Sequence, residues 1–208
     1  MNNSQQILDK IYISNSEIVG TGVFAKILIK KDDIVWQDND YPNKNENIIL
    51  SFNEIFGTTE HPSKLNKNQF SFFLNYMYQI DDNLFIGPIH TNNNDSSLYI
   101  NHSCNPNVYF KHRYTICAVR DIHINEEITF DYGTTDSHPG LEKYSDLLLY
   151  YKKCLCKSIN CRKKITSNDW KLPDLYNKLI PYLKKKLIAT NNLHQAHSAH
   201  SIQQLNFP

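Results

Sequence analysis

The sequence predicts a β-rich α+β fold. Many short segments have the alternating apolar pattern of strands, whereas amphipathic helical spacing is concentrated late in the chain. The 208 residues are 40% hydrophobic and 12% aromatic, enough for one folded domain, or for one domain with a small appendage. A net charge of +1 argues against a protein dedicated to binding nucleic acid, and no apolar run approaches the roughly 20 residues of a membrane span.

The first half of the chain is expected to contain mostly strands and loops. A polar lead-in over residues 1–10 precedes a strand, a glycine turn and a strand within Ile11–Ile34. Residues 37–47 are rich in Asn and Asp and are expected to form a loop. Alternation over Leu74–Ile80 predicts another strand, and Leu84–Gly87 follows it after a turn.

The second half combines strands with helical segments. Residues Tyr109–Asp131 are expected to form two strands, and Glu142–Lys153 has helical spacing. An amphipathic helix is predicted over Asp174–Ile180, and Pro181 is expected at the first position of a second short helix. Residues 190–208 are rich in Asn, Gln, His and Ser, which is typical of a frayed tail.

The five cysteines are unevenly distributed. Cys154, Cys156 and Cys161 form a C-x-C-x4-C cluster, and the N-terminus lacks the basic-then-apolar order of a secretory signal. A metal site is therefore favoured over disulfides. Structural zinc takes four ligands, so one more is needed. Cys117 lies in an expected buried strand, whereas Cys104 lies at a turn, which makes Cys104 the better donor.

Four segments, in order, resemble the SET-domain protein-lysine methyltransferases. Gly20–Ala25 is similar to the family's first glycine-containing motif, and Asn101–Asn107 matches its N-H-S-C-x-P-N signature without a mismatch. Glu126–Gly133 resembles the E-E-L-T-F-D-Y-G motif, and Cys154–Cys161 resembles the post-SET zinc cluster. In that family the cysteine of N-H-S-C is the fourth zinc ligand, which agrees with the choice of Cys104.

The resemblance implies a specific fold and division of the chain. The expected fold is a SET fold of short curved sheets with a knot-like C-terminal arrangement, followed by a zinc-binding post-SET segment and C-terminal helices. The expected segments are a SET domain over 8–133, a connecting helix over 134–150, a post-SET zinc-binding segment over 151–167, and C-terminal helices with a flexible tail over 168–208.

The resemblance also implies an activity and residue roles. The donor would be S-adenosyl-L-methionine and the acceptor a lysine of a histone or another protein. Tyr132 matches the catalytic tyrosine, and Tyr76 would orient the amine, with Tyr78 as the alternative. Cofactor contacts are expected from Thr21, Gly22, Tyr76, Asn101, His102, Tyr132 and Leu155. Zinc would be held by Cys104, Cys154, Cys156 and Cys161.

Two kinds of position refine this interpretation. Phe130 occupies the position that sets the number of methyl groups in the family, and phenylalanine there favours di- or trimethylation. Asn125 stands where glycine is common, so a left-handed conformation is expected at that turn. Leu98 replaces a common arginine and Lys157 a common glycine, and these departures bear mainly on substrate choice.

Two other interpretations are open. One is a non-catalytic binding module that keeps the SET fold. The other is a zinc-stapled nucleic-acid-binding protein that uses Lys152, Lys153, Lys157, Arg162, Lys163 and Lys164. Stacking aromatic residues are not interleaved among these cations, which disfavours the second interpretation. Reduced thiols imply an intracellular location, and cytoplasm, nucleus or delivery into another cell all fit. The sequence predicts no membrane partner.

Overall fold

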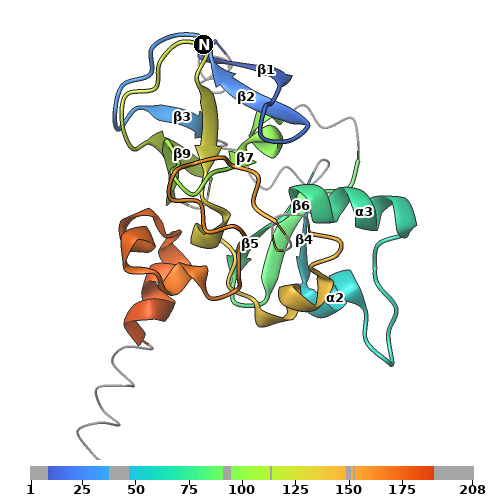
Figure 1. The fold of residues 1–208 in the computed structure, drawn as a ribbon. Helices are drawn as coiled ribbons and strands as arrows, with labels where there is room; N and C mark the ends of the chain where they lie inside the picture. The colour runs from blue at the N-terminus through green and yellow to red at the C-terminus, as the bar shows by residue number, and fades with distance from the viewer. Residues whose placement is uncertain are drawn as a thin grey trace, which may run out of the picture.

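Within the part of the chain that the structure describes, the strands form three small sheets (Figure 1). The computed structural model describes residues 9–37, 47–90, 95–112, 114–148, 151 and 153–189. Most of the expected lead-in and 37–47 loop, and the whole 190–208 tail, lie outside these residues. The α+β class with predominant strands is confirmed, because short strands are connected by short helices throughout the described chain.

The first sheet brings two sequence motifs together. Its strand order is β1-β2-β10-β7, and its central pair is antiparallel. β10 pairs with β7 in parallel, with Thr129 opposite Asn101 and Phe130 opposite His102. The bounds are β1 Ile11–Asn15, β2 Thr21–Ala25, β10 Glu127–Phe130 and β7 Asn101–His102. The expected strand–turn–strand near the N-terminus is confirmed, although residues 27–29 contribute only a single bridge.

The other two sheets have three antiparallel strands each. The second has the order β3-β9-β8, and the third has the order β4-β6-β5. Their bounds are β3 Ile34–Gln37, β9 Thr115–Ala118, β8 Val108–His112, β4 Asn47–Ser51, β6 Leu84–Pro88 and β5 Tyr78–Asp81. The prediction of two strands over residues 109–131 was wrong. Polar residues end β8 at His112, the chain returns as β9, and left-handed Asn125 (φ 66°) turns it into β10.

The strand predicted over Leu74–Ile80 was also wrong in its first half. Residues Lys67–Tyr76 form the helix α3, and β5 begins only at Tyr78. The helix is started by a capping box, in which Asn66 accepts the backbone N–H of Gln69 and the Gln69 side chain accepts that of Asn66. Apolar residues then recur at helical spacing and bury one face, so the helix overrides the local alternation.

The remaining helices are short and cover the sheets. They are α2 Phe52–Phe56 and the 3₁₀ turns η1 Ser96–Tyr99, η2 Tyr132–Thr134, η3 Pro139–Tyr144, η4 Asp169–Lys171 and η5 Pro173–Lys178. The predicted helix over Glu142–Lys153 was wrong for residues 142–148, which form the end of η3 and a turn, whereas residue 151 is helical. Residues 149, 150 and 152 lie outside the described residues. Residues 174–178 are likewise 3₁₀ helix, whereas the helix over 181–189 begins at Pro181 as expected.

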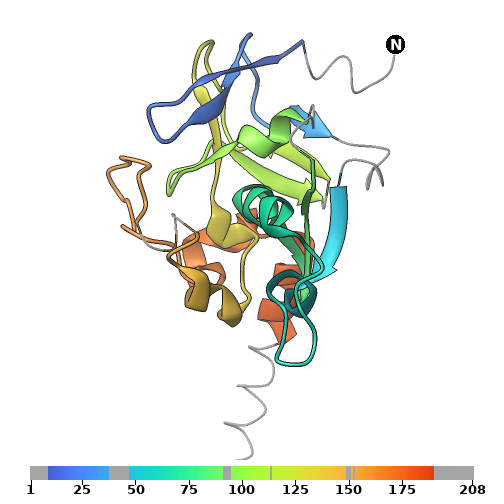
Figure 2. The same cartoon turned by 90° about the vertical axis from the view of Figure 1, so that its right-hand side faces the viewer.

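Two apolar cores hold these layers together. The first core lies among β1–β3, β7–β10 and the C-terminal helices, and includes Val23, Ile128 and Trp170. The second core joins α2, α3, β4 and β6, and includes Phe73 and Phe85. The two views in Figures 1 and 2 show α2, α3 and the β4-β6-β5 sheet on a different side from the β1–β2 hairpin. Within the described residues, every helix is too short or too polar to cross a bilayer.

Candidate active site and metal centre

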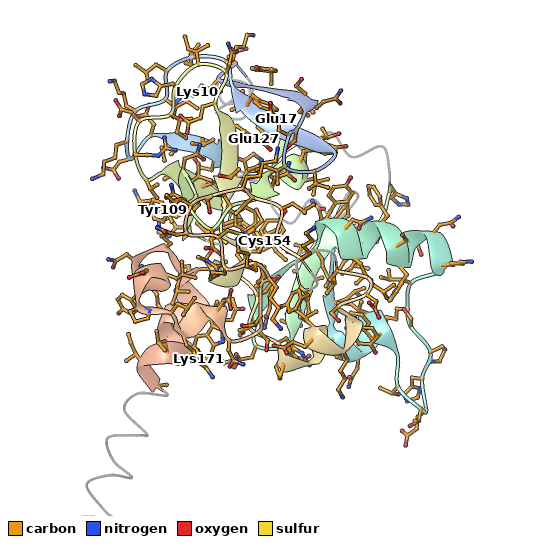
Figure 3. The ribbon with its side chains drawn as sticks, in the orientation of Figure 1. Lys10, Glu17, Tyr109, Glu127, Cys154 and Lys171 are labelled. Carbon is orange, nitrogen blue, oxygen red and sulfur yellow. The ribbon has the colours of Figure 1, made fainter. Side chains whose placement is uncertain are left out.

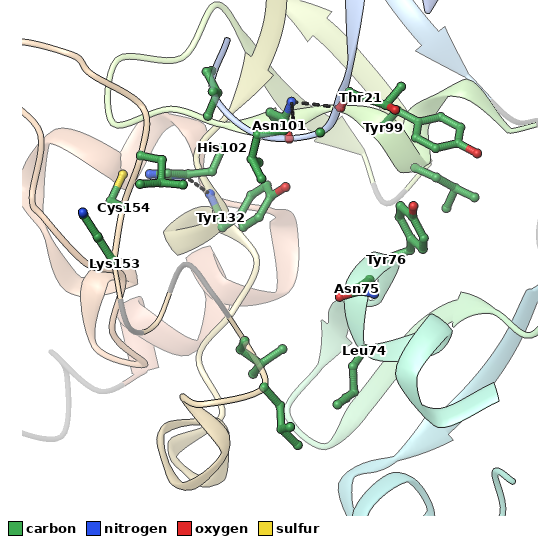
Figure 4. Close-up of a pocket in the computed structure, with 17 residues that line it drawn as sticks. Thr21, Leu74, Asn75, Tyr76, Tyr99, Asn101, His102, Tyr132, Lys153 and Cys154 are labelled. Carbon is green, nitrogen blue, oxygen red and sulfur yellow. Dashed lines mark hydrogen bonds between the residues drawn. The ribbon is translucent and has the colours of Figure 1, made fainter. Parts of the chain in front are cut away.

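A cavity of about 340 Å³ opens between the two cores (Figure 4). Its walls come from the β1–β2 turn, the end of α3, η1, β7, η2 and the segment before the cysteine cluster. The lining residues are Ile18, Val19, Gly20, Thr21, Leu74, Asn75, Tyr76, Leu98, Tyr99, Asn101, His102, Tyr132, Leu147, Leu148, Lys153, Cys154 and Leu155. Five of these residues are leucines, and Thr21, Tyr76, Tyr99 and Tyr132 carry hydroxyl groups.

A second, smaller cavity of about 40 Å³ adjoins the first. Six aromatic residues contribute to its wall, together with aliphatic residues and the polar residues Ser97, Thr135 and Asp136; the aromatic ones are Trp36, Tyr76, Tyr78, Phe110, Phe130 and Tyr132. Tyr76 and Tyr132 line both cavities, as do Asn75 and Leu98, so the two spaces adjoin at these residues. Of the two tyrosines considered for the amine-facing position, Tyr78 lines only the smaller cavity, where it packs against Phe110.

Tyr132 begins η2, directly after the buried strand β10. Its hydroxyl donates to the carbonyl of Ile100 at 3.2 Å, and its backbone N–H donates to His102 Nδ1 at 3.2 Å. Burial, together with the nearby Asp136 and Glu127 carboxylates, raises the pKa of Tyr132 far above its ordinary value. The hydroxyl therefore keeps its proton at neutral pH and acts as a hydrogen-bond donor.

Tyr76 reaches the cavities from the last residue of α3 (Figure 4). Its ring packs edge-on against Phe72 and Tyr99, with ring centroids 4.9 and 5.7 Å away. Burial raises the pKa of Tyr76, and the neighbouring Tyr99 raises it further. Both tyrosines at the junction are thus protonated hydroxyl groups in apolar surroundings.

Asn101 connects the first cavity to the glycine turn. Its Nδ2 donates to the carbonyls of Val19 (3.2 Å) and Thr21 (3.0 Å) and to Glu127 Oε1 (2.8 Å). Thr21 lines the cavity, whereas Gly22 is not among its lining residues. A Cβ on Gly22 would lie 2.5 Å from Glu127 Oε1, so the structure explains this glycine by packing against Glu127.

His102 lies between the cavity and the cysteine sulfurs. Its Nδ1 accepts the Tyr132 N–H, so the ring proton belongs on Nε2, which lies 3.3 Å from Cys104 Sγ. Burial lowers the pKa of His102 to about 4, although Asp131 opposes that effect. The ring is therefore neutral and donates toward the sulfur.

The sulfurs of Cys104, Cys154 and Cys156 gather beside His102, with all four ligand atoms within 4.8 Å of one another. Cys104 Sγ and Cys154 Sγ are 3.9 Å apart, across 50 positions of sequence. Cys161 lies outside this mutual group but hydrogen-bonds to Cys154. Figure 3 shows Cys154 near the middle of the molecule. Cys117 is fully buried in β9, as expected.

The donor chemistry fits a thiophilic divalent cation. Burial raises the pKa of Cys104 to about 11 and raises that of Cys154 further. Burial acts the same way on Cys156, but hydrogen bonds with Cys104 and Ser158 lower its pKa to about 6. A zinc ion would convert the protonated sulfurs to thiolates, because metal binding displaces such protons.

Arg162 was not identified as a site residue from the sequence. Its guanidinium forms two hydrogen bonds with the fully buried Asp131 (2.6 and 2.7 Å) and one with Asp169 (2.8 Å). The guanidinium of Arg162 is thus paired with two carboxylates of the same chain, which disfavours the use of Arg162 in the alternative nucleic-acid-binding interpretation. The only sequence signal was its place directly after Cys161. Phe110 was also missed, because a strand aromatic has an ordinary core explanation.

Comparison with known proteins gives a consistent result. A family model described as the SET domain matches residues 20–133, more than half of the chain. A histone-lysine N-methyltransferase specific for H3 lysine 9 from Fusarium mangiferae is 38% identical over 76 residues, which cover 31% of this chain and 22% of that protein. One specific for H3 lysine 4 from Chaetomium globosum is 35% identical over 100 residues, covering 42% and 8%.

This chain therefore spans less than a quarter of the length of these two relatives. A crystal structure of a candidate histone methyltransferase from Plasmodium falciparum overlaps 59% of this chain and 92% of that chain. The TM-score is 0.38 and the sequence identity is 23%, and these values are too low to support a functional conclusion.

Proposed function

Because this chain belongs to the SET-domain family of protein-lysine methyltransferases, we propose that it transfers methyl groups from S-adenosyl-L-methionine to a lysine of another protein. The observation that carries the proposal is the junction of the two cavities at Tyr76 and Tyr132. The larger space suits a nucleoside-sized ligand and the narrow aromatic one suits an alkyl-ammonium chain. Two reactants entering from different sides would meet beside two hydroxyl groups.

The larger cavity offers contacts for the methyl donor. When bound, S-adenosyl-L-methionine supplies an electrophilic methyl group on a sulfonium centre. The leucine-lined region, including Leu155, would accept its apolar ring system, and the backbone around Thr21 would face the polar end. Asn101 would contribute by fixing the Thr21 turn, and His102 through its backbone. Tyr76 and Tyr132 would border the transferred methyl group.

The smaller cavity would prepare the lysine amine. A free lysine has a pKa of about 10.4, yet only the neutral amine attacks. Aromatic walls from Trp36, Phe110 and Phe130 would exclude water and so disfavour the ammonium form, whereas the Asp136 carboxylate in the same lining would favour it. Loss of the proton would therefore also depend on repulsion from the positive sulfonium of the bound cofactor. The protonated Tyr132 hydroxyl cannot serve as a base; it would orient the amine and interact with the moving positive charge.

Cys104, Cys154, Cys156 and Cys161 would hold one structural zinc ion. Four cysteine ligands satisfy the tetrahedral preference of zinc, and the neutral His102 would then donate a hydrogen bond to Cys104 from outside the ligand set. The metal would tie residues 154–161 to the turn that carries Asn101 and His102. It would thereby close the wall of the larger cavity formed by Cys154 and Leu155.

Histones are the proposed substrate class, because the relatives named above carry that activity in their descriptions. A histone substrate would place the chain in the nucleus. We further propose di- or trimethylation, since Phe130 packs against Phe110 and Tyr132 without adding a hydroxyl to the smaller cavity. An extra hydroxyl there would bind water and restrict the space for a methylated amine.

The proposal is tested by incubating the chain with labelled S-adenosyl-L-methionine and either purified histones or a cell lysate. Label should appear on lysine. Tyr132→Phe should reduce the rate by about 10²-fold, because one preorganised donor is lost. Tyr176→Phe is the matched control, since that ring is 39% exposed in η5. Equal rates for Tyr132→Phe and the wild-type chain would contradict the proposal.

A further inference from the structure

Arg162 joins three separate segments of the chain. Its guanidinium contacts Asp131 with two nitrogens and Asp169 with a third, and its backbone N–H donates to Cys104 Sγ at 3.4 Å. Because Arg162 directly follows Cys161, its location depends on how the cysteine cluster folds. One residue thus touches the proposed metal ligands with its backbone and Asp131 with its side chain.

Asp131 links Arg162 to the neighbouring Tyr132. The Asp131 side chain is fully buried, and its Oδ1 also accepts the Gly133 N–H at 2.9 Å, which fixes the η2 turn. The intervening Tyr132 donates its own N–H to His102, which contacts Cys104 in turn. The backbone of Tyr132 is therefore held on both sides by groups attached to the cysteine cluster.

The packing at Gly133 shows how closely the segments approach. A Cβ at this position would lie 2.8 Å from Asp169 Cβ and 3.4 Å from an Arg162 nitrogen. Asp169 is itself fixed by the Thr166 hydroxyl at 2.6 Å. This geometry leaves no room for a side chain at position 133.

We infer that Arg162 is a positioning residue, an inference that rests on the proposed function. Through Arg162, the position of the Tyr132 hydroxyl depends on the folded cysteine cluster. A planar guanidinium can satisfy both oxygens of Asp131 and still reach Asp169, whereas an amide or an ammonium cannot. Without Arg162, the buried Asp131 lacks its cation and the η2 turn must rearrange. A displacement of about 1 Å at a reacting group can reduce a rate by about 10²-fold.

The test uses the full chain with tyrosine rings labelled with ¹³C. The Tyr132 ring signal is assigned by its loss in Tyr132→Phe. Spectra are compared for the wild-type chain with zinc, the wild-type chain after chelation, Arg162→Gln and Arg162→Lys. Lys164→Gln is the matched control, because it removes one exposed positive charge two positions away. Zinc content and methyl-transfer kinetics are measured on the same samples.

We expect both Arg162 variants to retain one zinc ion per chain. Their Tyr132 signal should shift toward its position in the chelated wild-type chain, and kcat should fall by about 10²-fold with little change in the KM for the cofactor. Lys164→Gln should match the wild-type chain. If Arg162→Gln does not fold, Arg162→Lys, which keeps the positive charge, tests the role of Arg162 instead.

A zinc-loaded variant with an unchanged Tyr132 signal would overturn the inference, as would loss of zinc from both variants. The spectra are independent of turnover. A wild-type chain that transfers no methyl group would refute the proposed function, yet the comparison of Tyr132 signals would still decide the role of Arg162.

Discussion

The two tyrosines at the junction are held in place by different kinds of interaction. Tyr132 is fixed by polar contacts, because its neighbours bind His102, Arg162 and, through them, the cysteine cluster. Tyr76 ends a helix whose buried face packs into the second core, and its ring packs edge-on against Phe72 and Tyr99. One side depends on charged and polar contacts that lead to the cysteine cluster, and the other on apolar packing.

This difference means that the two halves of the site should respond to different perturbations. Hydrogen bonds and ion pairs at Tyr132 are directional, so they define position closely but fail when one partner is lost. Apolar contacts at Tyr76 are numerous and non-directional, so they tolerate small changes and lose stability gradually. Four predictions separate these behaviours.

The largest effect is expected when the proposed zinc site, on the Tyr132 side of the junction, is disrupted. Cys104→Ser, or chelation of the wild-type chain, should abolish methyl transfer and reduce the free energy of unfolding by about 4 kcal/mol, as expected for a ligand at about 1,000 times its Kd. Zinc content, melting temperature and cofactor binding measure this. Cys117→Ala is the control, since Cys117 lies away from the cluster, and it should keep its zinc. An active Cys104→Ser chain without metal would disprove the metal's role.

Breaking the apolar side should have a comparable but slightly smaller effect on stability. Phe73→Ala empties a fully buried site in α3 and should reduce the free energy of unfolding by about 3 kcal/mol, measured by urea denaturation. The zinc content should stay at one ion per chain, because the cysteine cluster packs elsewhere. Ser71→Ala on the exposed face of the same helix serves as the control. Zinc loss in Phe73→Ala would show that the two sides are not independent.

A smaller effect is expected from pH on the second core alone. The side-chain hydrogen bond with Lys64, followed by those with Ser51, lowers the pKa of Glu54 to about 2 in the folded chain. A depressed folded pKa stabilises the fold above the unfolded value near 4.3, and this contribution is lost as pH falls toward 2. Because Glu54 is partly exposed, the loss should be below about 1 kcal/mol.

Thermal melts of the wild-type chain and Glu54→Gln between pH 6 and pH 2 measure this contribution. The difference in melting temperature between the wild-type chain and Glu54→Gln should shrink as the pH falls. A difference that stays constant with pH would contradict the assignment.

The smallest effect on stability, but a specific effect on product, is expected at Phe130. The centroid of this ring lies 4.7 Å from the centroid of the Tyr132 ring, and Phe130 lines the smaller cavity. Phe130→Tyr adds a hydroxyl that restricts the space for a methylated amine, so products should shift toward monomethyl-lysine with an unchanged melting temperature. Mass spectrometry of the products measures the shift. An unchanged product distribution would exclude Phe130 as the determinant.

Sequence reasoning was most successful where a local motif determines the structure. The C-x-C-x4-C spacing and the turn around Cys104 indicated which sulfurs would meet, and the structure brings Cys104, Cys154 and Cys156 together. The left-handed conformation expected at Asn125 is also confirmed. In both cases the determining residues lie within a few positions of each other or have few alternative partners.

Sequence reasoning failed where tertiary contacts decide. The alternation before Ile80 suggested a strand, although Asn66 and Gln69 already carried the signal of a helix start. Arg162 resembled one more cation in a lysine-rich stretch, because its partner Asp131 lies 31 positions earlier and its burial is invisible in the sequence. The close approach of Glu127 to Gly22 was likewise invisible in the sequence, because the two residues are more than 100 positions apart.

The parallel pairing of β7 with β10 has a consequence for protein synthesis. Parallel neighbours require a crossover, so Asn101 and Thr129 can meet only after the intervening hairpin has been made. The arginine that anchors Asp131 emerges from the ribosome about thirty residues later still. A nascent chain paused before residue 162 would therefore carry both tyrosines but an unanchored turn, and the site would be completed only after Arg162 has been made.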